Sequence, residues 1–363
     1  MNFSQILAFS LSLLLFTTAK ATSFEIKQIA SNLGVPWGLE FINDSELIFT
    51  EREGRVGLVN LNSLAVEYLE GVPEVMAYGQ GGLLDVAKSP KGDGKTLYFT
   101  YSKEQNGLGT TTLAKASLDG MRLINWQDIH ISKSHTDSDV HYGSRIAFDD
   151  NDYVYYSIGD RGERDNAQML DNHAGSVLRL NLDGSVPKDN PFASEQEALP
   201  EIWSYGHRNP QGLVWDSINQ RLWSIEHGPR GGDELNLIEK GKNYGWPEIS
   251  YGKEYWAPIS VGEGTHKKGM EQPLKVYIPS IAPGDLMIYS ANAFPQWQGN
   301  LFATALRLRH INRLVLDAQG KVIQEQRLLG DLDERIRAIK TALNGWIYFS
   351  TDSGKIYAIT PKN

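Results

Sequence analysis

The chain has 363 residues and carries 35 Lys and Arg against 44 Asp and Glu, a formal charge of −9. Nucleic-acid binding usually shows as a basic surplus, so this acidic balance argues against a nucleic-acid partner. The absence of cysteine excludes disulfides, thiolate nucleophiles, Cys-ligated zinc and iron–sulfur clusters. A hydrophobic content of 41% is that of an ordinary globular protein. The 35 glycines and the 10% of aromatic residues favour strands joined by tight turns.

The N-terminus has the pattern of a secretory signal. Residues 6–16 form the only long apolar run, which is about half the length that a membrane-spanning helix needs. Ala19-Lys20-Ala21 then fits the A-x-A pattern of a cleavage site. We therefore expect residues 1–21 to be a signal peptide, with no membrane insertion, and the mature protein to be periplasmic or secreted. The alternative is an apolar N-terminal strand or helix of the folded domain, because the leader begins without Lys or Arg.

Residues 22–363 contain no linker or low-complexity stretch, and we treat them as one domain. Within them, a short β-rich run, a turn and a second run repeat six times. The first runs begin at residues 47, 97, 153, 222, 301 and 347, so they are 50, 56, 69, 79 and 46 residues apart. A further apolar strand precedes each by roughly ten residues, starting near 38, 83, 145, 212, 285 and 336.

This repetition predicts an all-β fold, a six-bladed β-propeller, rather than a pair of β-sandwiches, because the spacing suits four-stranded blades with insertions. The strands near 38, 83, 145, 212, 285 and 336 would be the inner strands of the blades. A ring needs its first and last blades to be joined, and Phe24-Glu-Ile-Lys-Gln-Ile29 could supply the outer strand of the final blade.

The residues that enter the six inner strands would all face one end of the central channel. They are rich in hydrogen-bond donors, including Gln80, His141, Arg145, Arg208, Asn209, Arg335 and Arg337. Arginine forks beside amides suit a ligand with several carboxylates or carbonyls. A neutral histidine near such cations would have a lowered pKa and could act as a base.

Each of these residues also has a simpler interpretation. Arg335 and Arg337 alternate on one strand and could be solvated or paired in salt bridges. Gln80 lies between glycines, where a turn amide is common, and His141 could be a structural hydrogen bonder. Asn209-Pro210 could simply begin a turn, with Arg208 as its neighbour on the surface. Their shared position before successive inner strands is what favours a binding site.

The stretch 227–237 combines Gly-Pro and Gly-Gly with the carboxylates of Asp233 and Glu234. Backbone carbonyls and carboxylates are hard oxygen ligands that suit Ca²⁺, but the spacing is not that of an EF-hand, and an acidic turn is the alternative. The chain has no His-Glu-x-x-His, Walker A, Gly-x-Ser-x-Gly or first-strand Gly-x-Gly-x-x-Gly motif. The corresponding hydrolases, nucleotide enzymes and nicotinamide dehydrogenases are therefore unsupported.

The motifs together resemble the soluble quinoprotein sugar dehydrogenases, in particular the periplasmic aldose sugar dehydrogenases that use pyrroloquinoline quinone (PQQ). The resemblance covers residues 30–360. The residues that carry it are Gly79-Gln-Gly-Gly-Leu-Leu84, His141-Tyr-Gly-Ser-Arg145, Ile158-Gly-Asp-Arg-Gly162, Tyr205-Gly-His-Arg-Asn-Pro-Gln-Gly212, Glu226-His-Gly-Pro-Arg-Gly-Gly-Asp-Glu-Leu-Asn236, Asn243-Tyr-Gly-Trp-Pro247 and Arg335-Ile-Arg337.

The resemblance implies a six-bladed propeller and a set of site residues. His141 would be the general base, and Arg208 would stabilise negative charge on the cofactor. The cofactor-binding residues would be Gln80, Arg208, Asn209, Arg307, Arg335 and Arg337. Gly228 and Pro229 would hold a catalytic Ca²⁺, and Glu234 and Tyr244 a structural Ca²⁺.

The reaction implied is oxidation of an aldose to a lactone, with the anomeric proton taken by His141 and the C1 hydride by the quinone. Arg307 stands where the family has a cofactor-binding lysine. The arginine keeps the positive charge, but its planar guanidinium differs in geometry from the compact ammonium of lysine. Val140 replaces the Asp of the glucose-specific branch, so the preferred sugar stays open. The electron acceptor is not identified, and we expect a monomer or homodimer. The alternatives are a Ca²⁺-dependent propeller lactonase and a non-catalytic secreted binding propeller.

Overall fold

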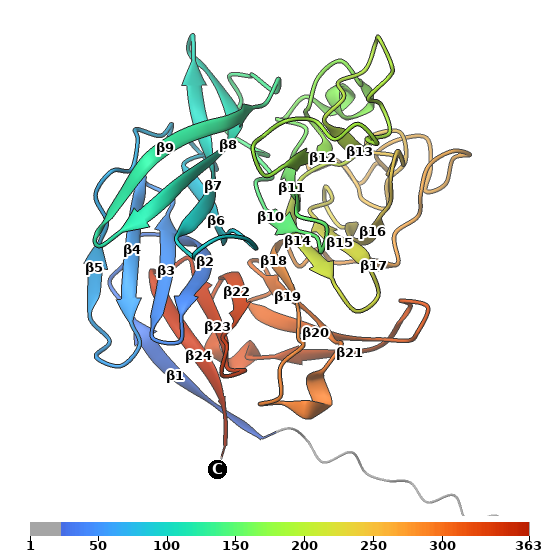
Figure 1. Cartoon of the computed structure of the whole chain (residues 1–363). Coiled ribbons are helices and arrows are strands. Elements are labelled where there is room, and N and C mark those ends of the chain that lie inside the picture. Colours follow the sequence, from blue (N-terminus) through green and yellow to red (C-terminus); the bar gives the residue numbers. More distant parts are fainter. Residues whose placement is uncertain (1–22, 363) are drawn as a thin grey trace, which may run out of the picture.

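The computed structural model describes residues 23–362. In this part of the chain, 24 strands form six four-stranded antiparallel sheets around a central channel (Figure 1). The prediction of an all-β, six-bladed propeller is thus confirmed. Three short 3₁₀ helices lie in the connections: η1 (Arg164–Gln168), η2 (Pro295–Trp297) and η3 (Gly330–Leu332).

The blades follow one another along the chain, each running from its inner to its outer strand. Blade 1 contains β2 (Pro36–Asn43), β3 (Glu46–Glu51), β4 (Arg55–Asn60) and β5 (Val66–Tyr68). Blade 2 contains β6 (Leu83–Lys88), β7 (Thr96–Gln105), β8 (Leu108–Asp119) and β9 (Arg122–Ile131). Blade 3 contains β10 (Ile146–Phe148), β11 (Tyr153–Ile158), β12 (Ser176–Asn181) and β13 (Ile202–Tyr205).

The second half of the ring repeats this order. Blade 4 contains β14 (Pro210–Asp216), β15 (Arg221–Glu226), β16 (Asp233–Ile238) and β17 (Lys275–Tyr277). Blade 5 contains β18 (Pro283–Ile288), β19 (Leu301–Ala305), β20 (His310–Leu316) and β21 (Val322–Leu328). Blade 6 contains β22 (Ile336–Thr341), β23 (Ile347–Thr351), β24 (Lys355–Pro361) and, as its outer strand, β1 (Phe24–Ala30).

The six inner strands begin within two residues of the predicted positions, at Pro36, Leu83, Ile146, Pro210, Pro283 and Ile336. The ring closes as predicted, because β1 pairs antiparallel with β24, with Phe24 opposite Pro361. Figure 1 shows β1 beside β24 at the seam. The signal-peptide prediction for residues 1–21 lies outside the described residues.

Alternating apolar side chains hold neighbouring blades together. In β3, Leu47 and Phe49 pack into a core shared with Ala338 and Tyr348 of blade 6, whereas Ile48 packs into the core shared with blade 2. A middle strand therefore carries apolar side chains at consecutive positions, since successive side chains point to opposite faces and both faces are covered. This is why runs such as Leu47-Ile-Phe are recognisable in the sequence.

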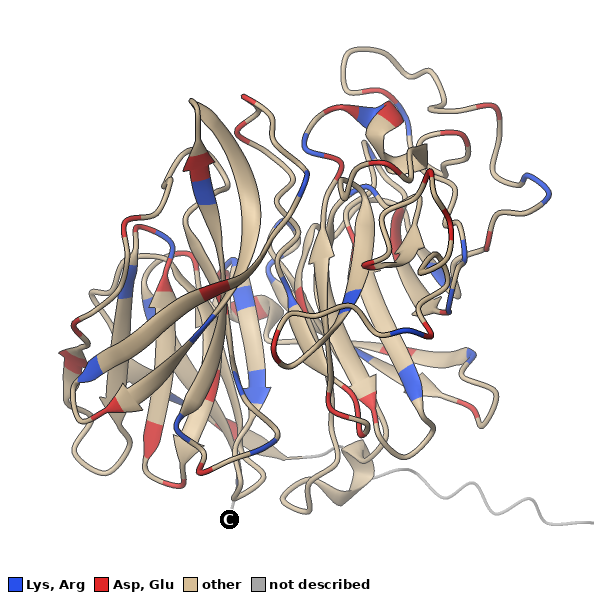
Figure 2. Cartoon of the chain, turned by 45° about the horizontal axis from the view of Figure 1, so that its top comes forward, with Lys and Arg blue, Asp and Glu red and all other residues tan. Residues whose placement is uncertain are grey.

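Within residues 23–362, no helix has the length and apolar character needed to span a membrane. Figure 2 shows acidic and basic residues interspersed over the strands and loops of the blades.

Candidate functional site

The channel has a cavity of about 190 Å³ at the N-terminal ends of the inner strands, which we call the donor cavity. All six blades contribute to it, because each inner strand starts there. Its lining contains four of the predicted cofactor-binding residues, together with residues that were not predicted. The lining is Trp37, Arg52, Gln80, Leu84, Tyr142, Gly143, Asn209, Gln211, His227, Ala282, Leu306, Arg335, Arg337 and Asp352.

His141 lies beside the donor cavity and is paired with Asp160. Its Nδ1 lies 2.6 Å from Asp160 Oδ1, and its backbone N–H donates to Gln80 Oε1 over 2.9 Å. The side chain is only 14% exposed. Burial lowers the pKa of His141, and the charges of Arg208 and Arg161 add to this effect, while Asp160 opposes it.

Asp160 fixes the tautomer of His141. Burial disfavours the carboxylate, but the hydrogen bond from His141 and the charge of Arg208 outweigh it, so the pKa of Asp160 stays below its ordinary value. An ionised carboxylate only accepts hydrogen bonds, so Nδ1 of the neutral imidazole carries the proton. Nε2 is then the nitrogen that can accept one, as a general base requires.

Arg208 and Asn209 connect the base to the next blade. Arg208 is buried, its Nη1 donates to Gly228 O over 2.8 Å, and its backbone N–H donates to Glu226 Oε2 over 2.7 Å. Its Nε is buried without a hydrogen-bond partner. Asn209 Oδ1 accepts from the Gly143 N–H over 3.1 Å, close to His141. An unpartnered charged donor in a buried position points to a missing acceptor.

Arg335 and Arg337 do lie at the donor cavity, but both are also paired with Asp352. The Nε atoms of the two arginines lie 2.8 and 2.9 Å from the Asp352 carboxylate oxygens. Arg337 is buried, whereas the Arg335 side chain is 48% exposed. The salt-bridge interpretation and the ligand-binding interpretation are therefore compatible, since a guanidinium has five N–H donors.

Two of the six predicted cofactor-binding residues do not line the donor cavity, Arg208 and Arg307. Arg208 lines the adjoining cavity described below, whereas Arg307 lines neither cavity. It follows β19 and is exposed, and its neighbour Leu306 takes part in the lining instead. Gln80 is exposed at the opposite rim, where its amide holds the backbone of His141.

All four predicted metal residues line one further cavity, of about 10 Å³, which we call the small acidic cavity. It adjoins the donor cavity through His227, which lines both. The lining is Gly206, Arg208, Glu226, His227, Gly228, Pro229, Gly232, Glu234, Tyr244, Trp246, Ile249 and Ser250. A cavity of this volume is about large enough for one water molecule or ion.

The loop geometry of the small acidic cavity requires glycine. A Cβ on Gly228 would lie 2.1 Å from the Gly232 carbonyl oxygen, and Gly232 itself has φ +77°. In this loop, the Gly228 carbonyl accepts a hydrogen bond from the Arg208 guanidinium. The Pro229 carbonyl accepts from Ser280 Oγ over 3.4 Å, a long contact.

Glu234 is a buried carboxyl beside a second carboxylate, and a bound cation would stabilise its ionised form. Burial, followed by the charge of Glu226, raises the pKa of Glu234 well above its ordinary value. Its hydrogen bond from Asn236 Nδ2 is long, at 3.4 Å, and Asn236 Oδ1 is buried without a partner. Tyr244 uses its hydroxyl to bind Leu237 O and the Glu239 N–H, so only its backbone carbonyl can serve a metal.

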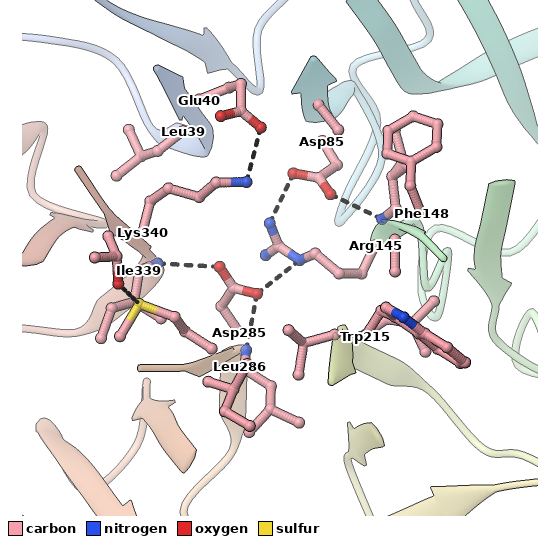
Figure 3. A pocket seen from close by; sticks show the side chains of 18 of the residues that line it. Leu39, Glu40, Asp85, Arg145, Phe148, Trp215, Asp285, Leu286, Ile339 and Lys340 are labelled. Carbon is pink, nitrogen blue, oxygen red and sulfur yellow. Dashed lines mark hydrogen bonds and ion pairs between the residues drawn. The ribbon is translucent and has the colours of Figure 1, made fainter. Parts of the chain in front are cut away.

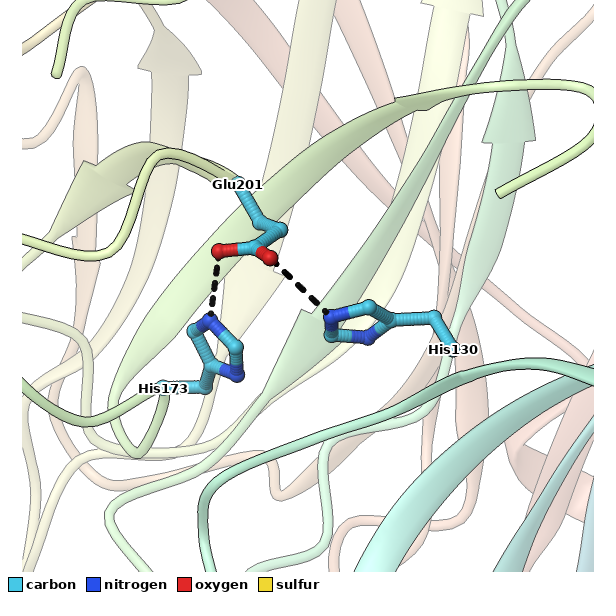
Figure 4. A group of neighbouring side chains, drawn as sticks. All are labelled: His130, His173 and Glu201. Carbon is cyan, nitrogen blue, oxygen red and sulfur yellow. Dashed lines mark hydrogen bonds and ion pairs between the residues drawn. The ribbon is translucent and has the colours of Figure 1, made fainter. Parts of the chain in front are cut away.

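A histidine cluster elsewhere has the residue types of a transition-metal site. Nitrogen and oxygen atoms of His130, His173 and Glu201 lie within 4.8 Å of one another between blades 2 and 3 (Figure 4). However, His173 Nδ1 accepts the Lys133 N–H over 3.0 Å, so its Nε2 carries the proton and donates to Glu201 over 3.2 Å. The cluster is thus a hydrogen-bonded tie between blades, and its imidazoles are not ligands that Ca²⁺ prefers.

A larger cavity of about 330 Å³, the distal cavity, lies farther along the inner strands. Figure 3 shows that its polar groups are already paired with one another. Lys340 Nζ lies 2.7 Å from Glu40 Oε2, and Arg145 lies 2.8 Å from Asp85 and 3.1 Å from Asp285. With its charges satisfied internally, this cavity offers a ligand fewer free groups than the donor cavity does.

Arg145 separates the two ends of the channel. Its guanidinium also donates to Gln211 O and Gly284 O, and its Cζ lies 4.3 Å from the centroid of the Trp37 ring. One side chain from blade 3 therefore contacts blades 1, 2, 4 and 5. Arg145 is a structural tie beneath the donor cavity.

Sequence reasoning missed several acidic partners, although a signal for them existed. Each second strand runs antiparallel to its inner strand, so its C-terminal end lies beside the N-terminal end of that strand. Three carboxylates at or just after those ends contact residues of the site, namely Asp160, Glu226 and Asp352. Glu51, at the end of β3, instead binds Gly34, Arg55 and Tyr68.

The chain also matches known proteins. The family model Glucose / Sorbosone dehydrogenase matches residues 33–358. Aldose sugar dehydrogenase YliI of Escherichia coli (strain K12) is 35% identical over 354 residues, 95% of this chain and 95% of that protein. Quinoprotein glucose dehydrogenase B of Acinetobacter calcoaceticus is 34% identical over 281 residues, 65% of this chain and 55% of that protein.

The solved structures agree with this match. The crystal structure of the soluble aldose sugar dehydrogenase from Escherichia coli in the apo-form has a TM-score of 0.89 and 32% identity, and covers 94% of this chain and 100% of that chain. With its six blades, its donor cavity and a family match over residues 33–358, the chain belongs to the glucose/sorbosone dehydrogenase family.

Proposed function

We propose that this member of the glucose/sorbosone dehydrogenase family oxidises the anomeric C1 hydroxyl of aldoses, with bound pyrroloquinoline quinone as the oxidant. The observation that carries the proposal is that a neutral imidazole backed by a carboxylate lies beside a cavity lined with arginine and amide donors. A base and a site for an anionic oxidant are the two parts that the reaction needs. The likeness to a protein named quinoprotein glucose dehydrogenase supports the choice of a quinone.

The donor cavity fits the chemistry of this cofactor. PQQ carries three carboxylates and an ortho-dione, which require cationic forks and amide donors. Arg335 spends two donor atoms on Asp352 and Leu306, so part of its guanidinium is free for a ligand. Gln80 and Asn209 supply amides from two other blades. The same residues would bind an uncharged sugar far less well than an anion.

The small acidic cavity fits Ca²⁺. Carbonyls of Gly228 and Pro229 and the carboxylate of Glu234 are oxygen ligands, and the cavity is of ionic size. The raised pKa of Glu234 and the orphaned Asn236 Oδ1 mark an unmet demand for positive charge there. The resemblance implies two ions, although the four residues line one cavity, so the number of ions bound is counted in the test below.

In the proposed reaction, the sugar loses one hydride, which carries two electrons, and one proton, and becomes a lactone. When bound, PQQ supplies the acceptor for the hydride that leaves C1. His141 Nε2 takes the proton from O1, while Asp160 stabilises the imidazolium that forms. Arg208, whose buried Nε has no hydrogen-bond partner, would supply positive charge that stabilises the reduced acceptor.

The rival hydrolase would use a channel metal held by side-chain carboxylates. The carboxylates that line the donor and distal cavities are each paired with a cation: Asp352 with Arg335 and Arg337, Asp85 and Asp285 with Arg145, and Glu40 with Lys340. This pairing favours the dehydrogenase over the lactonase.

We also propose that residues 1–21 direct export and that the mature chain works in the periplasm or outside the cell. The apolar run 6–16 and Ala19-Lys20-Ala21 support this. Mass spectrometry of the protein from fractionated native cells tests it. A mature N-terminus at Thr22 in the exported fraction is expected, and an intact N-terminus in the cytosol would contradict it.

The function is tested with purified apoprotein supplied with PQQ, Ca²⁺, both or neither. Dye reduction is then measured with a panel of aldoses, and the product is analysed for lactone. Turnover only with PQQ and Ca²⁺ together is expected, and the metal bound per chain is counted at the same time. Sugar binding without turnover would favour the non-catalytic propeller, and lactone hydrolysis without PQQ would favour the lactonase.

A further inference from the structure

Arg161 is a fully buried arginine on the segment that also carries Asp160. Its guanidinium contacts carbonyl oxygens and an aromatic face. Nη2 donates to Ser138 O over 2.7 Å, Nη1 donates to Val140 O, and Cζ lies 3.5 Å from the centroid of the Tyr142 ring. Its Nε is buried without a hydrogen-bond partner. A buried charge with such partners costs stability, so its presence calls for another role.

The groups that Arg161 contacts surround the proposed base in the sequence. Ser138 and Val140 precede His141, and Tyr142 follows it. His141 itself has φ +57°, a left-handed conformation that is strained for a residue with a Cβ. A strained conformation persists when surrounding contacts stabilise it. Here the Arg161 guanidinium binds the backbone before His141 and packs on the ring of Tyr142 after it.

Asp160 and Arg161 therefore position different parts of His141, the side chain and the backbone. Asp160 binds the imidazole Nδ1, which sets the tautomer and the ring orientation. Arg161, the next residue, binds the carbonyl of Val140, which belongs to the peptide bond before His141. This contact sets the position of the His141 backbone, from which the imidazole projects. Arg161 has φ +59°, so the clamp is itself held in an unusual conformation.

We propose that Arg161 is a positioning residue for the general base: its guanidinium clamps residues 138–142 and holds His141 in the conformation that directs Nε2 to the sugar. This inference rests on the proposed function, since it takes His141 as the base. Arg161 does not touch substrate or cofactor in this account, and it acts through the backbone and through its charge.

The first test uses the apoprotein and no activity. Histidine-labelled protein is titrated by NMR, and the His141 signal is identified by its loss in His141→Gln. The titratable and charged groups that face this ring are Asp160, Arg208, Arg161 and His227, and burial lowers the pKa of His227 to about 3, which keeps that imidazole neutral. Removal of the Arg161 charge should raise the pKa of His141 in Arg161→Gln, whereas Arg161→Lys should leave it near the parent value. An unchanged titration in Arg161→Gln would contradict the proposal.

The second test uses steady-state kinetics of the enzyme loaded with PQQ and Ca²⁺. Arg161→Gln should lower kcat by about 10- to 100-fold, the effect expected of a misplaced catalytic group, with little change in KM. The acid limb of its pH profile should move to higher pH. Arg161→Lys should restore the acid limb but only part of the rate, because an ammonium cannot form the planar fork.

Arg179 provides a matched control. It is also buried, it stacks on Tyr153 and Trp203, and it lies in β12 of the same blade, paired with Asp189. Arg179→Gln should lower the melting temperature and leave the pH profile unchanged. If Arg161→Gln behaves like this control, Arg161 is only structural. Should Arg161→Gln fail to fold, Arg161→Lys decides, because parent-like kcat in that variant contradicts the clamp.

His141→Gln, measured in parallel, separates the base from its clamp. A large loss of kcat in His141→Gln with parent kinetics in Arg161→Gln overturns the clamp alone. Parent kinetics in His141→Gln overturns the proposed base, and the clamp with it.

Discussion

His141 is the residue on which the proposed chemistry depends most. Replacement by Gln keeps polarity and approximate bulk but removes the base, so kcat should fall by roughly 10²- to 10⁴-fold. PQQ affinity and the melting temperature should stay near those of the parent, because Asp160 binds the imidazole, whereas Gln80 binds only the backbone N–H, which the variant keeps. Steady-state kinetics with saturating PQQ and Ca²⁺ measures this. Turnover close to the parent rate would show that His141 is structural.

Arg335 and Arg337 are expected to act on cofactor affinity. Each Ala substitution should weaken PQQ binding by about 1.5 to 3 kcal/mol, the range for charged hydrogen bonds. Asp352 keeps the second arginine as a partner in either variant, so folding should survive. The dissociation constant is measured by titrating apoprotein with PQQ. Arg313→Ala is the control, because Arg313 lies in β20 and binds Asn300. Parent affinity in both test variants would show that Arg335 and Arg337 only form salt bridges with Asp352 and do not bind PQQ.

At this scale, sequence reasoning identified the donors of the site better than their acceptors. The residues before the inner strands share one position in the repeat, so Gln80, Asn209 and Arg337 could be grouped from the order of the strands alone. Asp160 and Asp352 follow second strands, and their approach to the site depends on the antiparallel pairing of each second strand with its inner strand. Arg307 was placed by resemblance alone, and its side chain is exposed.

The loop between β15 and β16 is the element expected to depend on metal. Ca²⁺ should raise the melting temperature of the apoprotein, and exhaustive chelation of the loaded enzyme should abolish turnover. Glu234→Ala should reduce the Ca²⁺-induced rise more than it alters the order of preferred sugars, because Glu234 lies in the small acidic cavity rather than in the donor cavity. Differential scanning fluorimetry with and without Ca²⁺ measures this. Full activity after chelation would show that the reaction needs no metal.

The strands themselves were predictable to different degrees. Middle strands are buried on both faces and form continuous apolar runs, as in β3 and β23. Outer strands such as β21 are exposed at most positions and lack that pattern, so their side chains do not mark them in the sequence. β1 was recognisable because ring closure requires a strand from the other end of the chain.

Across the whole molecule, Arg145 and the carboxylates around it link stability to pH. Asp285 faces Arg145, Asp85 and Lys340 in the channel. Burial raises the pKa of Asp285 to about 6, and the charge of Asp85 adds to this, although Arg145 opposes it. The folded state thus binds this proton more tightly than the unfolded chain, whose carboxyl has a pKa of 3.8. The contribution of Asp285 to stability is present below pH 3.8 and is lost as the pH rises through about 6.

Asp285→Asn does not titrate, so its melting temperature relative to the parent should rise between about pH 4.5 and 7.5. Thermal unfolding of both proteins across this range measures the difference. Asp150→Asn is the control, since hydrogen bonds from Trp215, Ser217 and Gln220 lower the pKa of that carboxyl and leave it ionised throughout the range. A constant difference between Asp285→Asn and the parent would contradict the raised pKa.

The most direct test of the central claim is a single turnover without any dye. Apoprotein is loaded with one equivalent of PQQ and excess Ca²⁺, then mixed anaerobically with an aldose in a stopped-flow spectrophotometer. The absorbance of the bound quinone should change to that of its reduced form in a sugar-dependent exponential, with one lactone formed per quinone. A quinone spectrum that stays oxidised with every aldose tested, while PQQ is demonstrably bound, would contradict the assignment of this protein as a PQQ-dependent aldose dehydrogenase.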